Sequence, residues 1–104
     1  MKMKNKENKY WNPAKIGPKG ENEVSAWAFG IPNLPMFPNK AVRKFVEGIS
    51  KCDGFLGLRP EYPRGTLLIW KTENDAKRGR NRVKGYGVQT GGIAECFIPK
   101  EYAR

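Results

Sequence analysis

The chain has 104 residues, with 20 Lys and Arg against 10 Asp and Glu, which gives a formal net charge of +10 at pH 7. Hydrophobic residues make up 38% of it, enough for one domain with a modest core. Because the chain has no histidine and only two cysteines, it cannot build a zinc site from the usual Cys and His ligands, and we expect neither a metal nor a cofactor. An excess of positive charge this large repels itself and favours a polyanionic partner.

No segment of the sequence predicts a signal peptide or a membrane span. The Lys-rich residues 1–9 are not followed by an apolar run, as a signal peptide would require. The longest apolar runs are only a few residues, whereas a membrane span needs about 20. We therefore expect a cytoplasmic protein with no membrane partner, in which Cys52 and Cys96 are buried thiols.

Residues 1–23 are predicted to form a basic, flexible N-terminal tail, followed by a single α+β domain over residues 24–104. The tail holds six Lys and three Glu, and glycines and a proline interrupt any periodic pattern. Such a segment buries too little apolar surface to offset the entropy lost on ordering. Three of its residues are exceptions, and they either pin the tail to the domain or contact a partner: Tyr10, Trp11 and Ile16.

The first half of the domain predicts a strand, a stiff loop and a helix. Residues 24–31 alternate as a strand does, and prolines make residues 31–38 an irregular loop. Asn39 is a suitable N-cap for a helix, and Asp53-Gly54 is a suitable C-cap. Apolar residues at helical spacing form one stripe between these caps: Ala41, Val42, Phe45, Val46, Ile49 and Cys52.

The second half predicts a hairpin, a second helix and a last strand. Residues 55–59 and 66–71 read as short strands around the turn at residues 60–65. Thr72 starts a helix with Asp75 in a capping-box position, and Gly85 ends it. The buried stripe of this helix is thin, consisting of Ala76, Gly79 and Val83. A Gly-rich loop and a strand over residues 93–98 follow.

The order strand, helix, strand, strand, helix, strand predicts a ferredoxin-like βαββαβ sandwich of the α+β class. In this arrangement right-handed crossovers place two helices on one face of a four-stranded antiparallel sheet. The other face of the sheet is then open to solvent.

The second helix is the first candidate site because five cations fall within eight of its residues. Like charges four residues apart repel by tenths of a kcal/mol per pair, and a chain that accepts this repulsion can be presenting charge to a polyanion. Arginine also makes bidentate contacts with phosphate. The alternative is a solvated outer face with no ligand. The five residues are Lys77, Arg78, Arg80, Arg82 and Lys84.

The open sheet face is the second candidate site. If Leu67 and Ile69 face the helices, Trp70 faces out, and if Cys96 faces the helices, Phe97 faces out. The first strand is ambiguous: either its small residues face the helices and Trp27 and Phe29 face out, or these two aromatics are buried as core. Aromatics beside cations resemble a base-stacking surface, whereas an apolar patch also suits a homodimer or another protein. Two cations near this face complete the candidate residues, Arg59 and Arg64.

The element order resembles that of RNA-recognition-motif domains. On its third strand, that family carries Lys or Arg, then Gly, then alternating aromatics. Arg64-Gly65 matches the start of this signature. Thr66 and Leu68 stand where the stacking aromatics belong, so the signature is incomplete. An enzyme is not expected, because the chain has no histidine and no recognised nucleophile motif.

We therefore expect a small basic nucleic-acid-binding protein that contacts RNA or DNA phosphates through its second helix and tail. The alternative is a protein-interaction module or inhibitor, of the kind that phages and mobile elements encode, that docks on an acidic protein surface.

Overall fold

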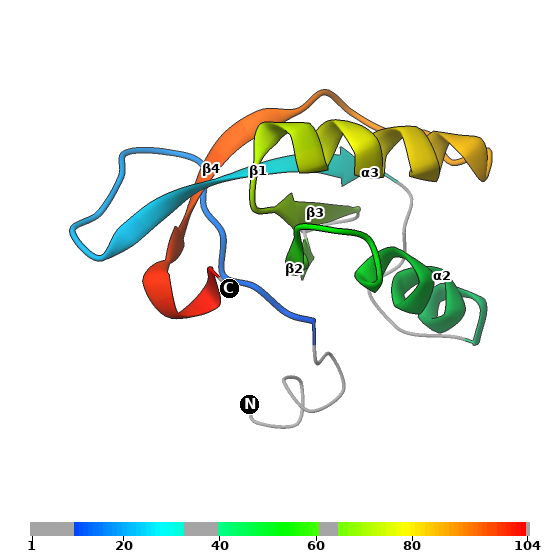
Figure 1. The fold of residues 1–104 in the computed structure, drawn as a ribbon, viewed down its shortest axis with the longest axis horizontal. Helices are drawn as coiled ribbons and strands as arrows, with labels where there is room; N and C mark the ends of the chain where they lie inside the picture. Colours follow the sequence, from blue (N-terminus) through cyan, green and yellow to red (C-terminus); the bar gives the residue numbers. More distant parts are fainter. Residues whose placement is uncertain (1–9, 33–39, 61–64, 104) are drawn as a thin grey trace.

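The computed structural model describes residues 10–32, 40–60 and 65–103, with the backbone alone for residues 40–43. It is an α+β fold with four strands, two α-helices and a short 3-10 helix (Figure 1). In chain order the elements are β1 (Glu23–Ile31), α2 (Lys40–Ser50), β2 (Phe55–Pro60), β3 (Thr66–Trp70), α3 (Glu73–Gly85), β4 (Ala94–Pro99) and η1 (Lys100–Tyr102).

The four strands form one antiparallel sheet in the order β2-β3-β1-β4. The predicted α+β class, the four-stranded antiparallel sheet and the two helices are thus confirmed. Three predicted features lie outside the described residues: Asn39 as a cap, residues 33–38 of the proline loop, and Arg64. Among the described residues, no helix is long and apolar enough to cross a membrane.

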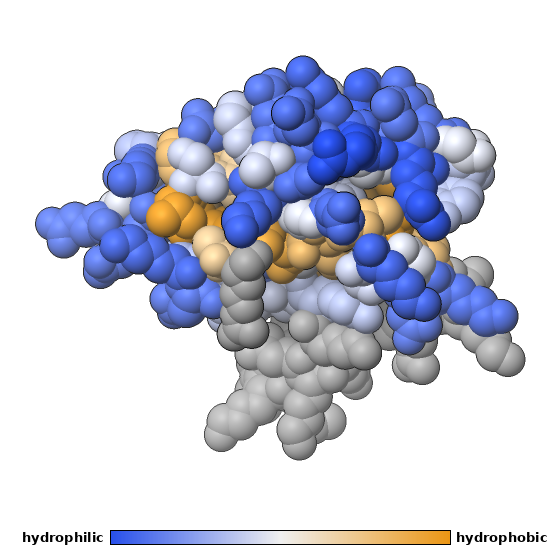
Figure 2. Space-filling model, in the orientation of Figure 1, coloured by the Kyte–Doolittle hydropathy of each residue, from blue (hydrophilic) through white to orange (hydrophobic). Residues whose placement is uncertain are grey.

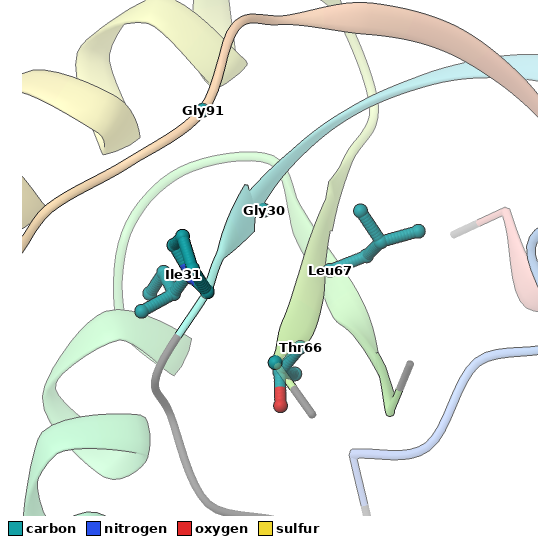
Figure 3. Close-up of a pocket in the computed structure, with 7 residues that line it drawn as sticks. Gly30, Ile31, Thr66, Leu67 and Gly91 are labelled. Atoms are coloured by element: carbon teal, nitrogen blue, oxygen red, sulfur yellow. The ribbon is translucent and has the colours of Figure 1, made fainter. Parts of the chain in front are cut away.

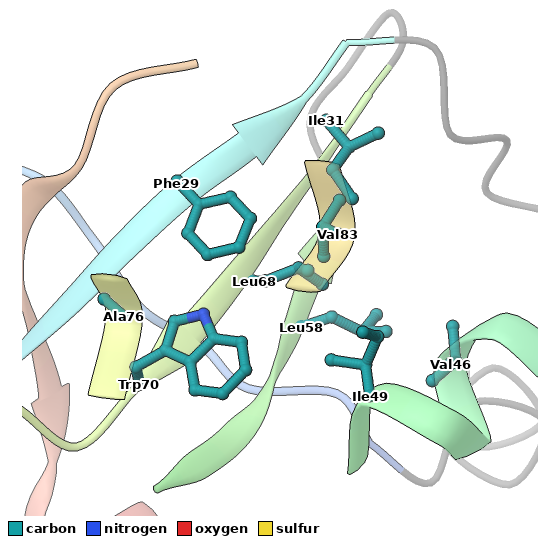
Figure 4. Close-up of a cluster of buried hydrophobic side chains, with 9 residues drawn as sticks. All are labelled: Phe29, Ile31, Val46, Ile49, Leu58, Leu68, Trp70, Ala76 and Val83. Atoms are coloured by element: carbon teal, nitrogen blue, oxygen red, sulfur yellow. The ribbon is translucent and has the colours of Figure 1, made fainter. Parts of the chain in front are cut away.

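The main core lies between the sheet and the two helices (Figure 4). Phe29, Leu68 and Trp70 are buried on this face and pack with Ile49 of α2 and Val83 of α3. The prediction that Leu67 and Ile69 face the helices is therefore wrong. Because every residue of β3 after Thr66 is apolar, alternation in that strand does not distinguish its two faces.

The first strand follows the second of its two predicted alternatives. Phe29 is buried under the helices, and Trp27 is half-buried against the same core. Ala26 and Ala28 point to the opposite face. The last strand is inverted relative to its prediction, because Cys96 lies on the face away from the helices. The aromatic side chains of β1 and β3 lie under the helices, whereas these two strands and β4 place alanine, cysteine and isoleucine side chains on the other face.

A β-bulge in β2 changes which residues share a face. Phe55 pairs with Trp70 and Gly57 pairs with Ile69, so one extra residue lies between these pairs. As a result Leu58 joins the core under the helices, whereas Leu56 packs on the other side of the sheet. Regular alternation, which predicts the same face for both leucines, cannot anticipate this insertion.

Residues 10–15 join the two outer edges of the sheet. At the β2 edge, the backbone amide of Asn12 donates to the Leu58 carbonyl at 2.8 Å. The backbone amide of Leu58 donates to the Tyr10 carbonyl at 2.7 Å. At the β4 edge, Lys15 and Phe97 exchange two backbone hydrogen bonds of 3.0 and 2.9 Å. We call residues 10–15 the edge clasp. In Figure 1 it is the blue segment that runs along the sheet toward β4.

The edge clasp requires a curled sheet. Three residues span at most about 10 Å, whereas the outer strands of a flat four-stranded sheet lie about 14 Å apart. The two edges must therefore curve toward each other around the clasp. Small side chains suit the concave surface that results, and this second core contains Ala14, Ala26, Ala28, Ile69, Cys96 and Ile98.

These contacts correct two expectations. Asn12 and Ala14 are fully buried, so a flexible tail through residue 23 does not describe this part of the chain. Tyr10 and Trp11 lie against the domain, whereas Ile16 is 65% exposed. The second sheet face is also not open: the edge clasp and η1 cover it, which removes the surface predicted for base stacking or for a homodimer.

Candidate nucleic-acid interface

Helix α3 begins and ends as its sequence predicts. The Thr72 hydroxyl accepts a hydrogen bond from the Asp75 amide at 3.0 Å, which caps the first turn. Glu73 and Asp75 place negative charge at the positive end of the helix dipole, and Arg82 and Lys84 place positive charge in the last turn. These local interactions favour a helix whose apolar stripe is very narrow.

A close approach to the sheet positions α3. Gly79 lies directly over the Trp70 ring, where a Cβ atom would collide with the indole. The ring is held by Phe29, stacked at 6.0 Å between centroids, and by Phe55, edge-on at 5.3 Å. Ala76, Gly79 and Val83 are buried as predicted. The residues of α3 that point away from the sheet therefore form a long solvent-facing surface.

Most of the predicted cations of α3 lie on this surface. Lys77, Arg78, Arg82 and Lys84 are exposed, and Arg80 is half-buried. No acidic residue occurs between Lys77 and Ala94 in the sequence. Hydrophilic residues accordingly cover the upper edge of the molecule in Figure 2, where Figure 1 places α3.

One of the five cations is paired with a carboxylate among the described residues. The Arg78 guanidinium forms an ion pair with Asp75 one turn earlier, yet its side chain stays 64% exposed. The Asp75 side chain is only 12% exposed, so the pair joins a buried carboxylate to a guanidinium that still faces solvent. Lys77 and Lys84 form no ion pair with any described residue.

Arg80 and Arg82 contact neutral groups on the two sides of α3. Arg80 Nε donates to the Thr90 hydroxyl at 3.2 Å and to the Gly91 carbonyl at 2.9 Å, which fastens the loop after α3. Arg82 Nε donates to the Tyr86 hydroxyl at 3.2 Å, and this hydrogen bond raises the pKa of Arg82. Both side chains keep their charge, but Arg80 is the less available to a ligand.

Asn81 lies at the centre of the cationic surface. A helix brings residues three and four positions apart side by side, so its neighbours are Lys77, Arg78, Lys84 and Gly85. All five of these residues are exposed. Sequence analysis singled out the cations and missed this amide, although the i±3 and i±4 spacing around residue 81 is visible in the sequence.

The other predicted site residues do not join this surface. Trp70 is fully buried beneath α3, and Phe97 is half-buried in β4, paired with Lys15. The Arg59 guanidinium donates to the Ala14 carbonyl and so holds the edge clasp on the opposite face of the sheet. The predicted aromatic platform is therefore wrong.

A shallow hollow lies at one end of β1 and β3 (Figure 3). It is lined by Gly30, Ile31, Thr66, Leu67 and Gly91 among others, and its walls are almost wholly apolar. None of its described lining residues is charged. Within residues 10–32, 40–60 and 65–103, no cluster of His, Cys, Asp or Glu suits a metal ion, and both cysteines are free thiols.

No protein-family model matches the chain, and neither a curated protein nor a solved structure matches it. The comparisons therefore assign no ligand to the α3 surface.

Proposed function

We propose that this protein binds nucleic acid through the outer surface of α3, with Lys77, Arg78, Arg82 and Lys84 contacting phosphates. The observation that carries the proposal is the exposure of these four cations on one helix. Residues 1–9 add four lysines to the charge of the chain, and we propose that they contribute further phosphate contacts.

The distribution of carboxylates supports a polyanionic ligand. The described carboxylates outside α3 are spread over other elements: Glu21 just before β1, Glu23 at its start, Glu47 in α2, Asp53 after it, Glu95 in β4 and Glu101 in η1. Within α3 the acidic residues are confined to the first turn. The last two turns therefore carry uncompensated positive charge, which a phosphate backbone would neutralise with release of its counterions.

We also propose that the fold is a ferredoxin-like variant. Its support is the order β2-β3-β1-β4, in which each helix connects two strands that are separated by one other strand. Side chains of both helices contribute to one core on the same side of the sheet. The edge clasp on the other side is an addition that leaves α3 as the exposed cationic element.

The test is fluorescence anisotropy with labelled duplex DNA, single-stranded DNA and RNA across a KCl series. If about four cations each neutralise one phosphate, the logarithm of the association constant falls with the logarithm of salt concentration with a slope of about −3 to −4. Lys77→Glu with Lys84→Glu should weaken binding about tenfold or more and flatten this slope.

The matched control is Lys19→Glu with Lys100→Glu, which changes the net charge by the same amount. Both control lysines are exposed and lie outside α3. If the two double variants lose affinity equally, binding follows net charge and α3 is not the interface. If the wild-type chain binds no nucleic acid at low salt, the proposed function is wrong, and docking on an acidic protein becomes the better hypothesis.

A further inference from the structure

Resting on the proposed function, we infer that the ligand is duplex DNA, that α3 lies in its major groove, and that Asn81 contacts base edges there. The proposal follows from the arrangement of side chains on α3 and from the burial of the aromatic residues that a single strand would need. It adds a specificity-determining residue to a surface whose cations bind phosphate without regard to sequence.

Single-stranded nucleic acid fits the described surface poorly. Proteins that bind single strands stack bases on exposed aromatic side chains. Here Trp70 and Phe29 are buried under the helices. Trp11 and Tyr102 contact each other edge-on at 6.1 Å, beside the covered face of the sheet. Tyr86 is exposed near α3 but packs on Phe45 of α2. The described part of the chain thus offers no row of aromatics beside the cations.

The exposed cations of α3 lie on both sides of a central line that runs along the helix through Asn81. At 100° per residue, Lys77 and Lys84 fall on one side of Asn81, and Arg78 and Arg82 fall on the other. A helix in a groove has a phosphate backbone on each side, so this distribution places cations against both strands. A helix with its side chains is about 10 to 12 Å wide, which matches the major groove of B-form DNA at about 12 Å. The deep, narrow major groove of A-form RNA does not admit one.

Asn81 is placed to reach the floor of the groove. It lies on the central line, it is exposed, and Gly85 one turn later has no side chain to hold the DNA away. Asparagine can pair with both N6 and N7 of adenine, and this is a common way for proteins to select an A·T pair. The stretch from Lys77 to Gly85 is about 12 Å long, so it covers only about three to four base pairs.

Asn74 supplies a matched comparison on the same helix. It is exposed and lies seven residues before Asn81, so the two amides point in nearly the same direction. However, Asn74 follows Glu73, an exposed carboxylate that would repel the phosphates beside any base the amide approached. We therefore expect Asn81 to contact bases and Asn74 to remain in solvent.

The experiment uses the full chain and 20-base-pair DNA duplexes whose six central pairs are randomised. Bound duplexes are separated at a fixed salt concentration and sequenced. The wild-type chain should enrich A·T at one or two adjacent positions. Asn81→Ala should reduce that preference about tenfold while changing affinity for the unselected mixture and the salt slope little. Asn74→Ala should leave the preference intact.

The outcomes separate this inference from the proposed function. If single-stranded DNA or duplex RNA binds as tightly as duplex DNA, groove insertion is wrong and nucleic-acid binding stands. If Asn81→Ala keeps the preference of the wild type, or if no preference emerges, base contact by Asn81 is wrong. If no nucleic acid binds at low salt, both proposals fail. Circular dichroism of each variant confirms that an exposed Asn→Ala change leaves the fold intact.

Discussion

At the scale of single residues, the contact between Gly79 and Trp70 decides where the cationic surface lies. The glycine lets α3 rest on the indole, and the indole is fixed by Phe29 and Phe55. A larger residue at position 79 would lift the helix from the sheet. The sequence predicted a close approach through Ala76 and Gly79 but not the partner, because Trp70 was assigned to the other face.

Gly79→Ala should destabilise the protein by about 1 to 2 kcal/mol. Overpacking against the ring costs about 1 to 3 kcal/mol, and the better helix propensity of alanine offsets up to about 1 kcal/mol of this. The measurement is urea unfolding followed by circular dichroism. Gly85→Ala is the control, because nothing lies within 4 Å of a Cβ there. A Gly79→Ala protein as stable as Gly85→Ala would contradict the described packing.

Cys96 should make stability fall at alkaline pH. Burial, aided by the charge of Glu95, raises the pKa of its thiol to about 11 from an ordinary value of 9.0. Above pH 9 the unfolded chain therefore binds fewer protons than the folded one, and stability is lost progressively as pH rises toward 11. The loss amounts to about 1 kcal/mol at pH 10.

The check is to unfold the wild type and Cys96→Ala in urea between pH 7 and pH 10, under reducing conditions. Lysine and tyrosine titrations affect both proteins, so the difference between them isolates the thiol. Cys96→Ala is expected to be less stable at pH 7 but to lose less on going to pH 10. Parallel pH profiles would show that the thiol titrates normally and is accessible.

At the scale of elements, the edge clasp is the feature that sequence reasoning missed. Residues 10–15 have no hydrophobic alternation, and their bonds to the sheet are mostly backbone bonds, which leave little trace in side-chain patterns. Two signals were available: Tyr10 and Trp11, for which pinning to the domain was one predicted role, and Gly57. Its φ of +145° and its contact with the Tyr10 carbonyl suit glycine alone. In the sequence, where the contact with the edge clasp is not visible, Gly57 indicates only a strand that is weakened by a glycine.

Arg59→Met should loosen the edge clasp while the helix-covered core stays folded. The substitution removes the bond from the guanidinium to the Ala14 carbonyl, and hydrogen bonds to charged groups contribute about 1.5 to 3 kcal/mol. Hydrogen exchange of the Asn12, Lys15 and Phe97 amides should therefore accelerate about tenfold or more. Amides in the centre of α3 should be unaffected.

Arg82→Met is the control, because it removes a guanidinium that contacts Tyr86 and not the clasp. Equal protection of the Lys15 and Phe97 amides in wild type and Arg59→Met would mean that the backbone bonds hold the clasp without the arginine. Uniform acceleration throughout the chain would instead indicate that the clasp and the main core open together.

At the scale of the whole molecule, composition and periodicity predicted the class of fold, the number of strands and helices, and the exposed cations of α3. They could not assign the faces of the sheet. Thr66–Trp70 is apolar on both sides, because both faces are covered. We expected one face of the sheet to be open because the two helices were the only elements predicted to cover it. Of the two candidate sites, the aromatic sheet surface is lost and the cationic surface of the second helix, α3, is kept.

The edge clasp also has a consequence for the order in which the protein forms. Position 12 bonds to position 58, and position 15 bonds to position 97, so the earliest part of the described chain completes its contacts only after the latest strand has left the ribosome. Residues 10–12 can pair with β2 before β4 is made, but until then the edge of β1 that receives β4 presents unpaired amides and carbonyls to neighbouring chains. Molecules interrupted during synthesis before β4 are therefore the ones most prone to associate through that edge, which β4 covers in the finished molecule.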